Sequence, residues 1–474
     1  MLAESNKSNE KILIIDNIKM EQMEPEEEDE KYTTVEKIIY ILKGISSIIS
    51  GIIHIFGYYS IQVLGFSIAY LISFRRYYNN DLDYSHAYCL FPLVNLVLCM
   101  TIPLSGIIED KFGGKTTIFL SNFILCISFL FLYYSKSIYV DYCLMCLNGF
   151  GIGIGINITK KNACSFFMNY KCLILGTINL IPNILSFFLM YYNELDILNY
   201  ANEPPLVEYT YYRKKVFINY KKLIISEIKI LIYTSIGSIL LYFQNNPKET
   251  IKFGFNQKTE NTKSENINEA SYNIKVIEKK KKKSKKEKII KALYNNRTIR
   301  LIFLVLLFTP KINLIHNTIK MDITLYFMYG IAYYLAGAAS SLLFTIIGDC
   351  LQFRIFFAFM CIISTVSSLI LVNYIEEGFV VAFETVFASF IFNGFNIIFD
   401  SHIMKVYGRD NYSHINGIVR SSGGLSEILA IFFKFGLKWD SLGFKIAYFA
   451  TGLLSLLSLI IGIFEADDIF DYDY

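Results

Sequence analysis

The chain has 474 residues, of which 54% are hydrophobic and only 18% are charged. Soluble domains carry about 25% charged residues, so this composition calls for an apolar solvent. The formal net charge is +4, which gives no reason to expect a nucleic-acid partner.

The apolar residues form long runs, as expected of transmembrane helices, which need about 20 mostly apolar residues. The first six runs occupy 38–72, 86–107, 117–134, 138–159, 168–191 and 223–243. Six more occupy 298–319, 323–347, 354–374, 378–399, 414–434 and 445–464. Lipid offers the backbone no hydrogen-bond partners, so each span must be a helix. We predict an all-α membrane protein with twelve transmembrane helices in two six-helix halves.

A polar segment, 244–297, separates the halves and ends in a lysine-rich run. Because it is too polar to fold by itself, we predict that this segment is a linker. The halves are then 38–243 and 298–464, with acidic tails at 1–37 and 465–474. The positive-inside rule places the linker, and with it both termini, in the cytosol. Against this rule, several basic residues before the sixth run would be external: Arg213, Lys214, Lys215, Lys221 and Lys222.

The turn between the second and third runs carries the most specific motif, Gly106-Ile-Ile-Glu-Asp110-Lys111-Phe-Gly113-Gly-Lys115. It resembles the signature of the major facilitator superfamily. A degenerate copy with Asp349 and Arg354 follows the eighth run. The resemblance implies transport by alternating access, with ion pairs at a cytosolic gate that break as the halves rock. The gate would comprise Gly106, Asp110, Lys111, Gly113, Lys115, Asp349 and Arg354.

Three weaker features resemble the oxalate/formate antiporter and monocarboxylate transporter branch. They are the glycines at 149, 151, 153 and 155, the stretch 199–205, and the segment 406–424. In that branch, basic residues on helices eight and eleven hold the oxalate dianion. Run 323–347 contains no Arg or Lys, and Gly423 stands where the lysine of helix eleven would fall. These departures speak against oxalate as the solute.

Ionisable and polar residues at membrane depth are costly, so each is a candidate for function. The candidates for binding solute or a proton are His54, Gln62, Asn179, Asn183, Lys311, Asn313, Glu384, Arg420 and Glu427. Arg420 could bind an anionic solute or pair with an acid across the cavity. Alternatively, its side chain could snorkel to the cytosolic surface. Glu427 could carry a coupling proton or pair with Lys434. His54 could relay protons or be a hydrogen-bonded core residue.

Each of two further groups of candidate residues has two possible interpretations. Asn179 and Asn183 flank Pro182 and could line a cavity or bond a neighbouring helix. Lys311 and Asn313 follow Pro310 in the most polar run. An interrupted helix of this kind often lines a transporter site. Alternatively, the helix ends at Phe308 and the rest is an external loop.

The leading hypothesis is a secondary active or facilitative transporter of a small polar or anionic, monocarboxylate-like metabolite. The alternative is a carrier fold that acts as a sensor, receptor or channel. An enzyme is not expected, because the sequence shows no clustered acid/base or metal ligands such as HExxH or paired Asp motifs. No Walker A pattern is present, so direct ATP drive is not expected either. No cofactor or metal is expected. The expected partners are a small-molecule solute, the lipid bilayer and, if transport is coupled, protons, with a monomer as the default. The plasma membrane and an internal organelle are equally compatible locations.

Overall fold

The computed structural model describes residues 34–65, 71, 75, 90–167, 169–200, 208–211, 214–217, 220–245, 287, 289–311, 323–350, 352–374, 378–436 and 441–465. Most of the predicted N-terminal tail, most of the linker, and Asn313 lie outside these residues. The chain divides into two units, Met1–Leu42 and Lys43–Tyr474. All contacts given below lie within the second unit.

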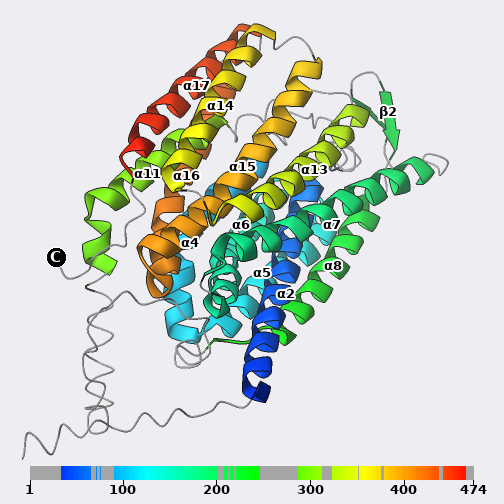
Figure 1. Cartoon of the computed structure of the whole chain (residues 1–474). Helices are drawn as coiled ribbons and strands as arrows, with labels where there is room; N and C mark the ends of the chain where they lie inside the picture. Colours follow the sequence, from blue (N-terminus) through cyan, green and yellow to red (C-terminus); the bar gives the residue numbers. More distant parts are fainter. Residues whose placement is uncertain are drawn as a thin grey trace, which may run out of the picture. The chain divides into compact units, whose positions relative to one another are not determined.

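Helices occur at every predicted run (Figure 1). The N-terminal set consists of α2 (Thr34–Gly65), α4 (Leu90–Phe112), α5 (Gly114–Tyr134), α6 (Ile138–Phe166), α7 (Lys171–Tyr200) and α8 (Tyr220–Leu240). The C-terminal set consists of α11 (Asn296–Phe308), α13 (Ile323–Ile347), α14 (Phe353–Tyr374), α15 (Gly378–Val406), α16 (Arg409–Gly436) and α17 (Ser441–Ile463). The all-α membrane class is confirmed. One feature was not predicted: β1 (Glu208–Tyr211) and β2 (Lys214–Phe217) pair antiparallel between α7 and α8.

Ten of the described helices are long and apolar enough to cross a membrane. The two others are α11, which is described over 13 residues, and α16. Helix α16 is long enough at 28 residues, but charged, amide and hydroxyl side chains lower its average hydropathy. The protein is therefore a multi-pass integral membrane protein, and the count of twelve spans stays a prediction.

Large apolar side chains point outward on several helices. Phe119 and Phe123 on α5, and Phe359 on α14, are each more than half exposed. Small polar residues such as Ser121 and Ser128 are instead buried between helices. This inverted distribution is what a lipid solvent allows, because exposed hydrocarbon carries no penalty there.

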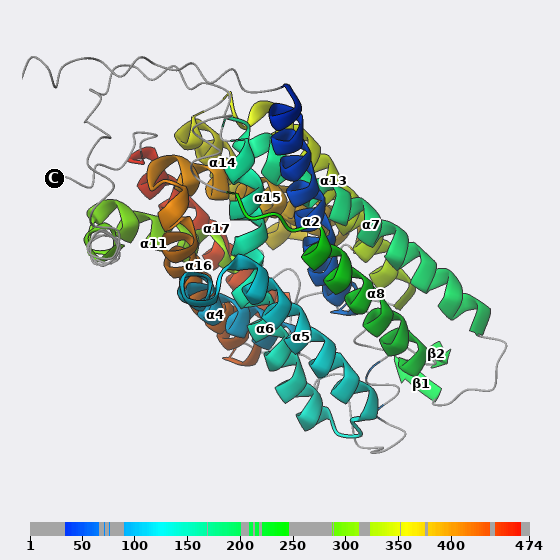
Figure 2. The same ribbon diagram turned by 90° about the horizontal axis from the view of Figure 1, so that it is seen from below.

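The two sets meet along an interface, called the seam here, in which α4 lies along α16 and α7 lies along α13 (Figure 2). Close crossing depends on small residues. A Cβ added to Gly417 would lie 2.8 Å from Pro103 Cα, and one added to Gly106 would lie 2.8 Å from His414 Nδ1. A larger side chain at either position would push α4 and α16 apart.

Two glycines with positive φ make the tight turns at one end of the seam. Gly113 (φ 83°) joins α4 to α5, and Gly408 (φ 75°) precedes α16. Only glycine adopts this left-handed conformation without strain. We call this the Gly113 end.

Residues from the predicted linker and C-terminal tail meet within the C-terminal set. Glu465 is buried, and one of its carboxylate oxygens lies 2.5 Å from Arg297 Nε and 3.3 Å from His402 Nε2. These contacts tie the start of α11, the end of α15 and the chain just after α17 together.

Candidate functional site

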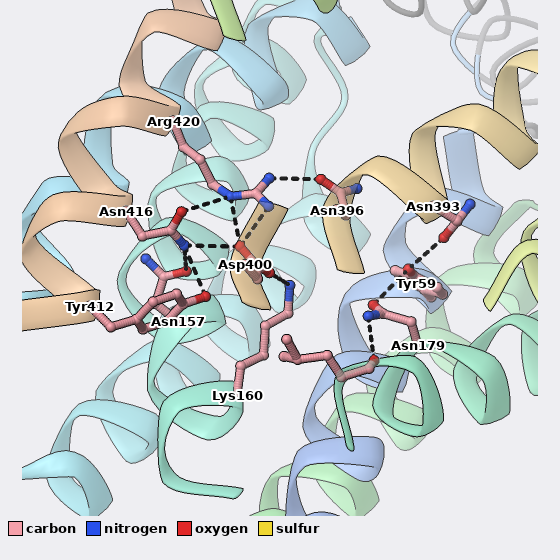
Figure 3. A network of polar contacts seen from close by, with 11 residues as sticks. Tyr59, Asn157, Lys160, Asn179, Asn393, Asn396, Asp400, Tyr412, Asn416 and Arg420 are labelled. Carbon is pink, nitrogen blue, oxygen red and sulfur yellow. Dashed lines mark hydrogen bonds and ion pairs between the residues drawn. The ribbon is translucent and has the colours of Figure 1, made fainter. Parts of the chain in front are cut away.

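A charged network crosses the seam (Figure 3). Lys160 on α6 belongs to the N-terminal set, and its Nζ lies 2.9 Å from Asp400 Oδ2 on α15. Arg420 Nη2, on α16, lies 2.7 Å from the other carboxylate oxygen, Oδ1. One carboxylate is thus shared by two cations from opposite sets.

Neutral groups complete this network. Arg420 Nη1 donates to Asn396 Oδ1 at 2.7 Å, and Arg420 Nε lies 3.2 Å from Asn416 Oδ1. Asn416 Nδ2 lies 3.0 Å from Asn157 Oδ1 on α6 and 2.9 Å from Tyr412 Oη. The amide pair between Asn416 and Asn157 is a second link across the seam, beside the link between Lys160 and Asp400.

The charges of the network do not cancel. Two cations and one carboxylate leave one excess positive charge. Burying a charge in a protein interior costs several kcal/mol unless partners compensate it. The excess charge is therefore the feature of this region that most needs a functional explanation.

An uncharged cluster occupies another part of the seam (Figure 3). Tyr59 Oη on α2 lies 3.3 Å from the Oδ1 atoms of both Asn179 on α7 and Asn393 on α15. Asn183 Nδ2, also on α7, donates to Asn393 Oδ1 at 3.3 Å. Tyr334 on α13 donates to the carbonyl of Tyr59 at 3.4 Å. The predicted residues Asn179 and Asn183 thus lie at the seam and contact the opposite set through this cluster.

Asp110 lies at the Gly113 end of the seam. Its Oδ2 is 2.9 Å from His414 Nε2, near the start of α16. The neighbouring Glu109 accepts a hydrogen bond from Ser413 at 2.9 Å and pairs with Lys161 at 2.9 Å. The end of α4 thus contacts the first turns of α16 through two consecutive carboxylates.

Asp349 makes the counterpart contact between α13 and α7. Its two carboxylate oxygens accept from the backbone N–H groups of Cys172 (3.1 Å) and Leu173 (3.2 Å), in the first turn of α7. A carboxylate is stabilised there because the first N–H groups of a helix lack partners and carry partial positive charge. Asp110 and Asp349 therefore each contact the start of a helix in the opposite set.

The three basic residues predicted for the gate are not brought into these contacts. Lys111, Lys115 and Arg354 are exposed. Lys111 Nζ lies 5.1 Å from the centre of the Phe112 ring, and Arg354 donates to Gln352 at 3.3 Å. The assignment of the whole group as a gate stays a prediction.

His54 lies inside the N-terminal set. Its Nε2 contacts Tyr58 Oη, which in turn lies 2.9 Å from Ser121 Oγ on α5. The ring is 1% exposed, whereas Gln62, two turns on, is half-buried. The partners in this chain of contacts, Tyr58 and Ser121, both belong to the N-terminal set.

Lys311 and Glu384 form a buried ion pair inside the C-terminal set. Lys311 Nζ is 2.5 Å from Glu384 Oε1, donates to the carbonyl of Ser364 at 2.7 Å and contacts Ser367 Oγ. Helix α11 does end at Phe308, as one interpretation expected, but Lys311 is 1% exposed and is not in an external loop.

Glu427 on α16 is buried and hydrogen-bonds the side chain of Asn95 on α4, across the seam. The side chain of its alternative partner, Lys434, lies outside the described part of the chain. Among the described residues, no group of three or more His, Cys, Asp or Glu side chains could hold a metal ion.

Sequence analysis missed the two residues that link Arg420 to the N-terminal set, Lys160 and Asp400. The predicted runs ended at 159 and 399, one residue before each of these charges. The helices continue past them, α6 to Phe166 and α15 to Val406. A hydropathy scan ends a run at a charge, so a charge directly after an apolar run was the signal that could have identified both.

The sequence matches no family model and no curated protein. The fold is similar to solved structures of low sequence identity. The proton:xylose symporter XylE bound to 6-bromo-6-deoxy-D-glucose is 11% identical, with a TM-score of 0.63 over 89% of this chain and 94% of that chain. The human organic anion transporter MFSD10 is 10% identical, with a TM-score of 0.57 over 89% of this chain and 99% of that chain. The protein therefore has the major facilitator fold.

Proposed function

We propose that the protein belongs to the major facilitator superfamily and is a secondary active or facilitative transporter. It moves a small polar or anionic, monocarboxylate-like metabolite across a membrane by alternating access. The observation that carries this proposal is the charged network of Lys160, Asp400 and Arg420 across the seam. A static bundle would gain stability by replacing such charges with apolar residues. A carrier needs polar contacts that part and re-form as its two sets rock.

Arg420 is the proposed contact for the solute. Its side chain is 18% exposed, whereas that of Asp400 is 1% exposed, so Arg420 is the more accessible member of the pair. A guanidinium presents paired N–H donors that match a carboxylate. The major facilitator fold accommodates both a sugar symporter and an organic anion transporter. The excess positive charge, rather than the fold, is the reason for proposing an anion.

Asp110 and Asp349 are the proposed gate at the Gly113 end. Each links one set to the start of a helix in the other. Asp110, at the end of α4, does so through His414, and Asp349, just after α13, through the first turn of α7. Opening this end would break both contacts. By the positive-inside rule this end faces the cytosol, together with both termini.

Glu427 is the best-placed candidate for a coupling proton. Among the carboxylates predicted from sequence, it contacts the opposite set within the membrane, through Asn95. Glu384 is engaged by Lys311 within one set. A proton on Glu427 would remove a buried charge at the seam, which would ease the motion of the two sets.

Uptake by purified protein in liposomes tests this proposal. The panel contains labelled monocarboxylates, dicarboxylates, amino acids and sugars, with and without an inward proton gradient, and protein-free liposomes are the control. Saturable uptake of an acid is the expected result, and a rise with the gradient indicates proton coupling. Uptake of sugars alone would contradict the anionic solute. If a folded protein transports no member of the panel, the sensor or channel alternative replaces the carrier.

A further inference from the structure

Taking the carrier function above as its basis, we infer that Asp400 sets the charge selectivity of the solute site. By neutralising one of two cations, it leaves a single excess positive charge. The site would therefore accept a solute with one negative charge and discriminate against a dianion. Asp400 is thus a specificity-determining residue, although the solute itself contacts Arg420.

The geometry holds Asp400 in this role. Oδ2 accepts from Lys160 Nζ at 2.9 Å, and Oδ1 accepts from Arg420 Nη2 at 2.7 Å. Asn416 Nδ2 also lies 3.2 Å from Oδ1. Both carboxylate oxygens are therefore occupied by donors. These hydrogen bonds hold the carboxylate between the two cations, so that it has little freedom to rotate away from either.

Among the described residues, the side chains that contact Arg420 or Asp400 add no further charge to this count. The side chains that contact Arg420 other than Asp400 are the amides of Asn396 and Asn416 and the ring of Phe399, whose centre lies 5.5 Å from Cζ. The charges that act on Asp400 are those of Lys160 and Arg420. Glu427 lies two helical turns further along α16 and bonds Asn95.

One contact of Arg420 can be exchanged for a solute. Asn396 supplies a neutral oxygen to Nη1, and Asn396 is half-buried, unlike Asp400. A solute carboxylate that replaced this amide would form a stronger, charge-assisted hydrogen bond. It would also cancel the excess charge. A second carboxylate on the same solute would find no unmatched cation and would lose its hydration without compensation.

Charge variants in liposomes test the inference, with lactate as the monoanion and succinate as the dianion. At neutral pH the carboxyl groups of both solutes are ionised. Asp400→Asn keeps the shape of the side chain but leaves two excess positive charges. We expect the succinate-to-lactate uptake ratio to rise about tenfold or more. Lys160→Met leaves the network with no excess charge, and we expect lactate uptake to fall about tenfold or more.

Two further variants separate charge from structural damage. Asn396→Asp removes no cation but cancels the excess charge, so it should also lose lactate uptake. Asp410→Asn is the matched control, because Asp410 is 76% exposed at the start of α16, outside the network. It makes the same chemical change as Asp400→Asn and should keep the wild-type ratio. If Asp400→Asn does not fold, Lys160→Met and Asn396→Asp decide the question.

Thermal stabilisation of the detergent-solubilised protein by lactate or succinate provides a second readout that needs no transport. Wild-type protein should be stabilised more by lactate, and Asp400→Asn more by succinate. The inference is overturned if folded Lys160→Met and Asn396→Asp keep the wild-type preference within about twofold, or if wild-type protein prefers succinate. Both outcomes leave the carrier standing. Wild-type protein that neither transports nor is stabilised by any acid overturns the anionic solute and this inference together, and the carrier falls with them if no other member of the solute panel is transported either.

Discussion

The seam contains two polar clusters that differ in chemistry. The charged network centres on Asp400, and the uncharged cluster centres on Asn393. Both residues lie on α15, seven residues apart and therefore on one face of that helix. One helix face thus presents an ionic contact and an amide contact to the opposite set.

The contacts in the two clusters also differ in length. The ion pairs of Asp400 measure 2.7 and 2.9 Å, whereas Tyr59 and Asn183 meet Asn393 at 3.3 Å. The amides of Asn183 and Asn393 also bond the backbone of their own helices, at 2.8 and 3.0 Å. The amide groups of the uncharged cluster therefore find shorter hydrogen bonds within their own set than across the seam. The charged network includes an ion pair across the seam, between Lys160 and Asp400, so separating the sets disturbs it more.

Removing the cation of Arg420 should produce the largest effect. In Arg420→Gln, Asp400 keeps Lys160 as its partner, but the paired N–H donors of the guanidinium, which would bind an anion, are lost. The loss of one partner from a buried ionic contact corresponds to about 3–5 kcal/mol, so uptake of an acid should fall roughly 100-fold or more. Uptake by Arg420→Lys, which keeps the positive charge without the planar guanidinium, should fall less. An unchanged apparent affinity in Arg420→Gln would remove Arg420 from the solute site.

A buried ion pair away from the seam should affect stability instead of transport. Lys311→Met leaves Glu384 charged and without its cation, and should lower the free energy of unfolding by about 3 kcal/mol. The double variant with Glu384→Gln should recover much of that loss. Thermal unfolding in detergent measures both. If the double variant transports no acid although it is stable, the pair takes part in function and the contrast with the charged network fails.

Removing one gate contact should have an intermediate effect. Asp110→Ala loses the bond to His414, while the counterpart at Asp349 remains. A hydrogen bond to a charged group contributes about 1.5–3 kcal/mol, so we expect roughly tenfold slower uptake by a protein that still folds. Asp349→Ala is the matched variant in the other gate contact. Normal uptake by well-folded Asp110→Ala would show that this contact does not gate transport.

The smallest effect is expected in the uncharged cluster. Asn183→Ala removes one 3.3 Å hydrogen bond between neutral groups. Such a bond contributes about 1 kcal/mol, so the apparent affinity for solute should change roughly fivefold. Concentration-dependent uptake measures the change. A loss as large as that of Arg420→Gln would mean that the amides contact the solute directly and that the two clusters are one site.

The helical runs were predictable because lipid imposes a length and a composition on each span. The predicted limits of α13 (323–347) are those observed, and those of α17 differ by a few residues. Polar helices were harder to judge. Helix α16 was found from its apolar residues, yet its average hydropathy is below that of the other long helices because it carries charged, amide and hydroxyl residues. Several of these, such as Ser413 and His414, contact the other set.

The sequence by itself determined the membrane class, the positions of the helices and Arg420 as a candidate, because these depend on local composition. It did not identify the partners of Arg420. Lys160 and Asp400 are 240 residues apart, and the predicted helices ended just before each of them. Ion pairing depends on distances of a few ångströms, which arise only when α6, α15 and α16 pack together. Tertiary structure alone therefore decided that these charges meet, and that the network holds two cations but one carboxylate.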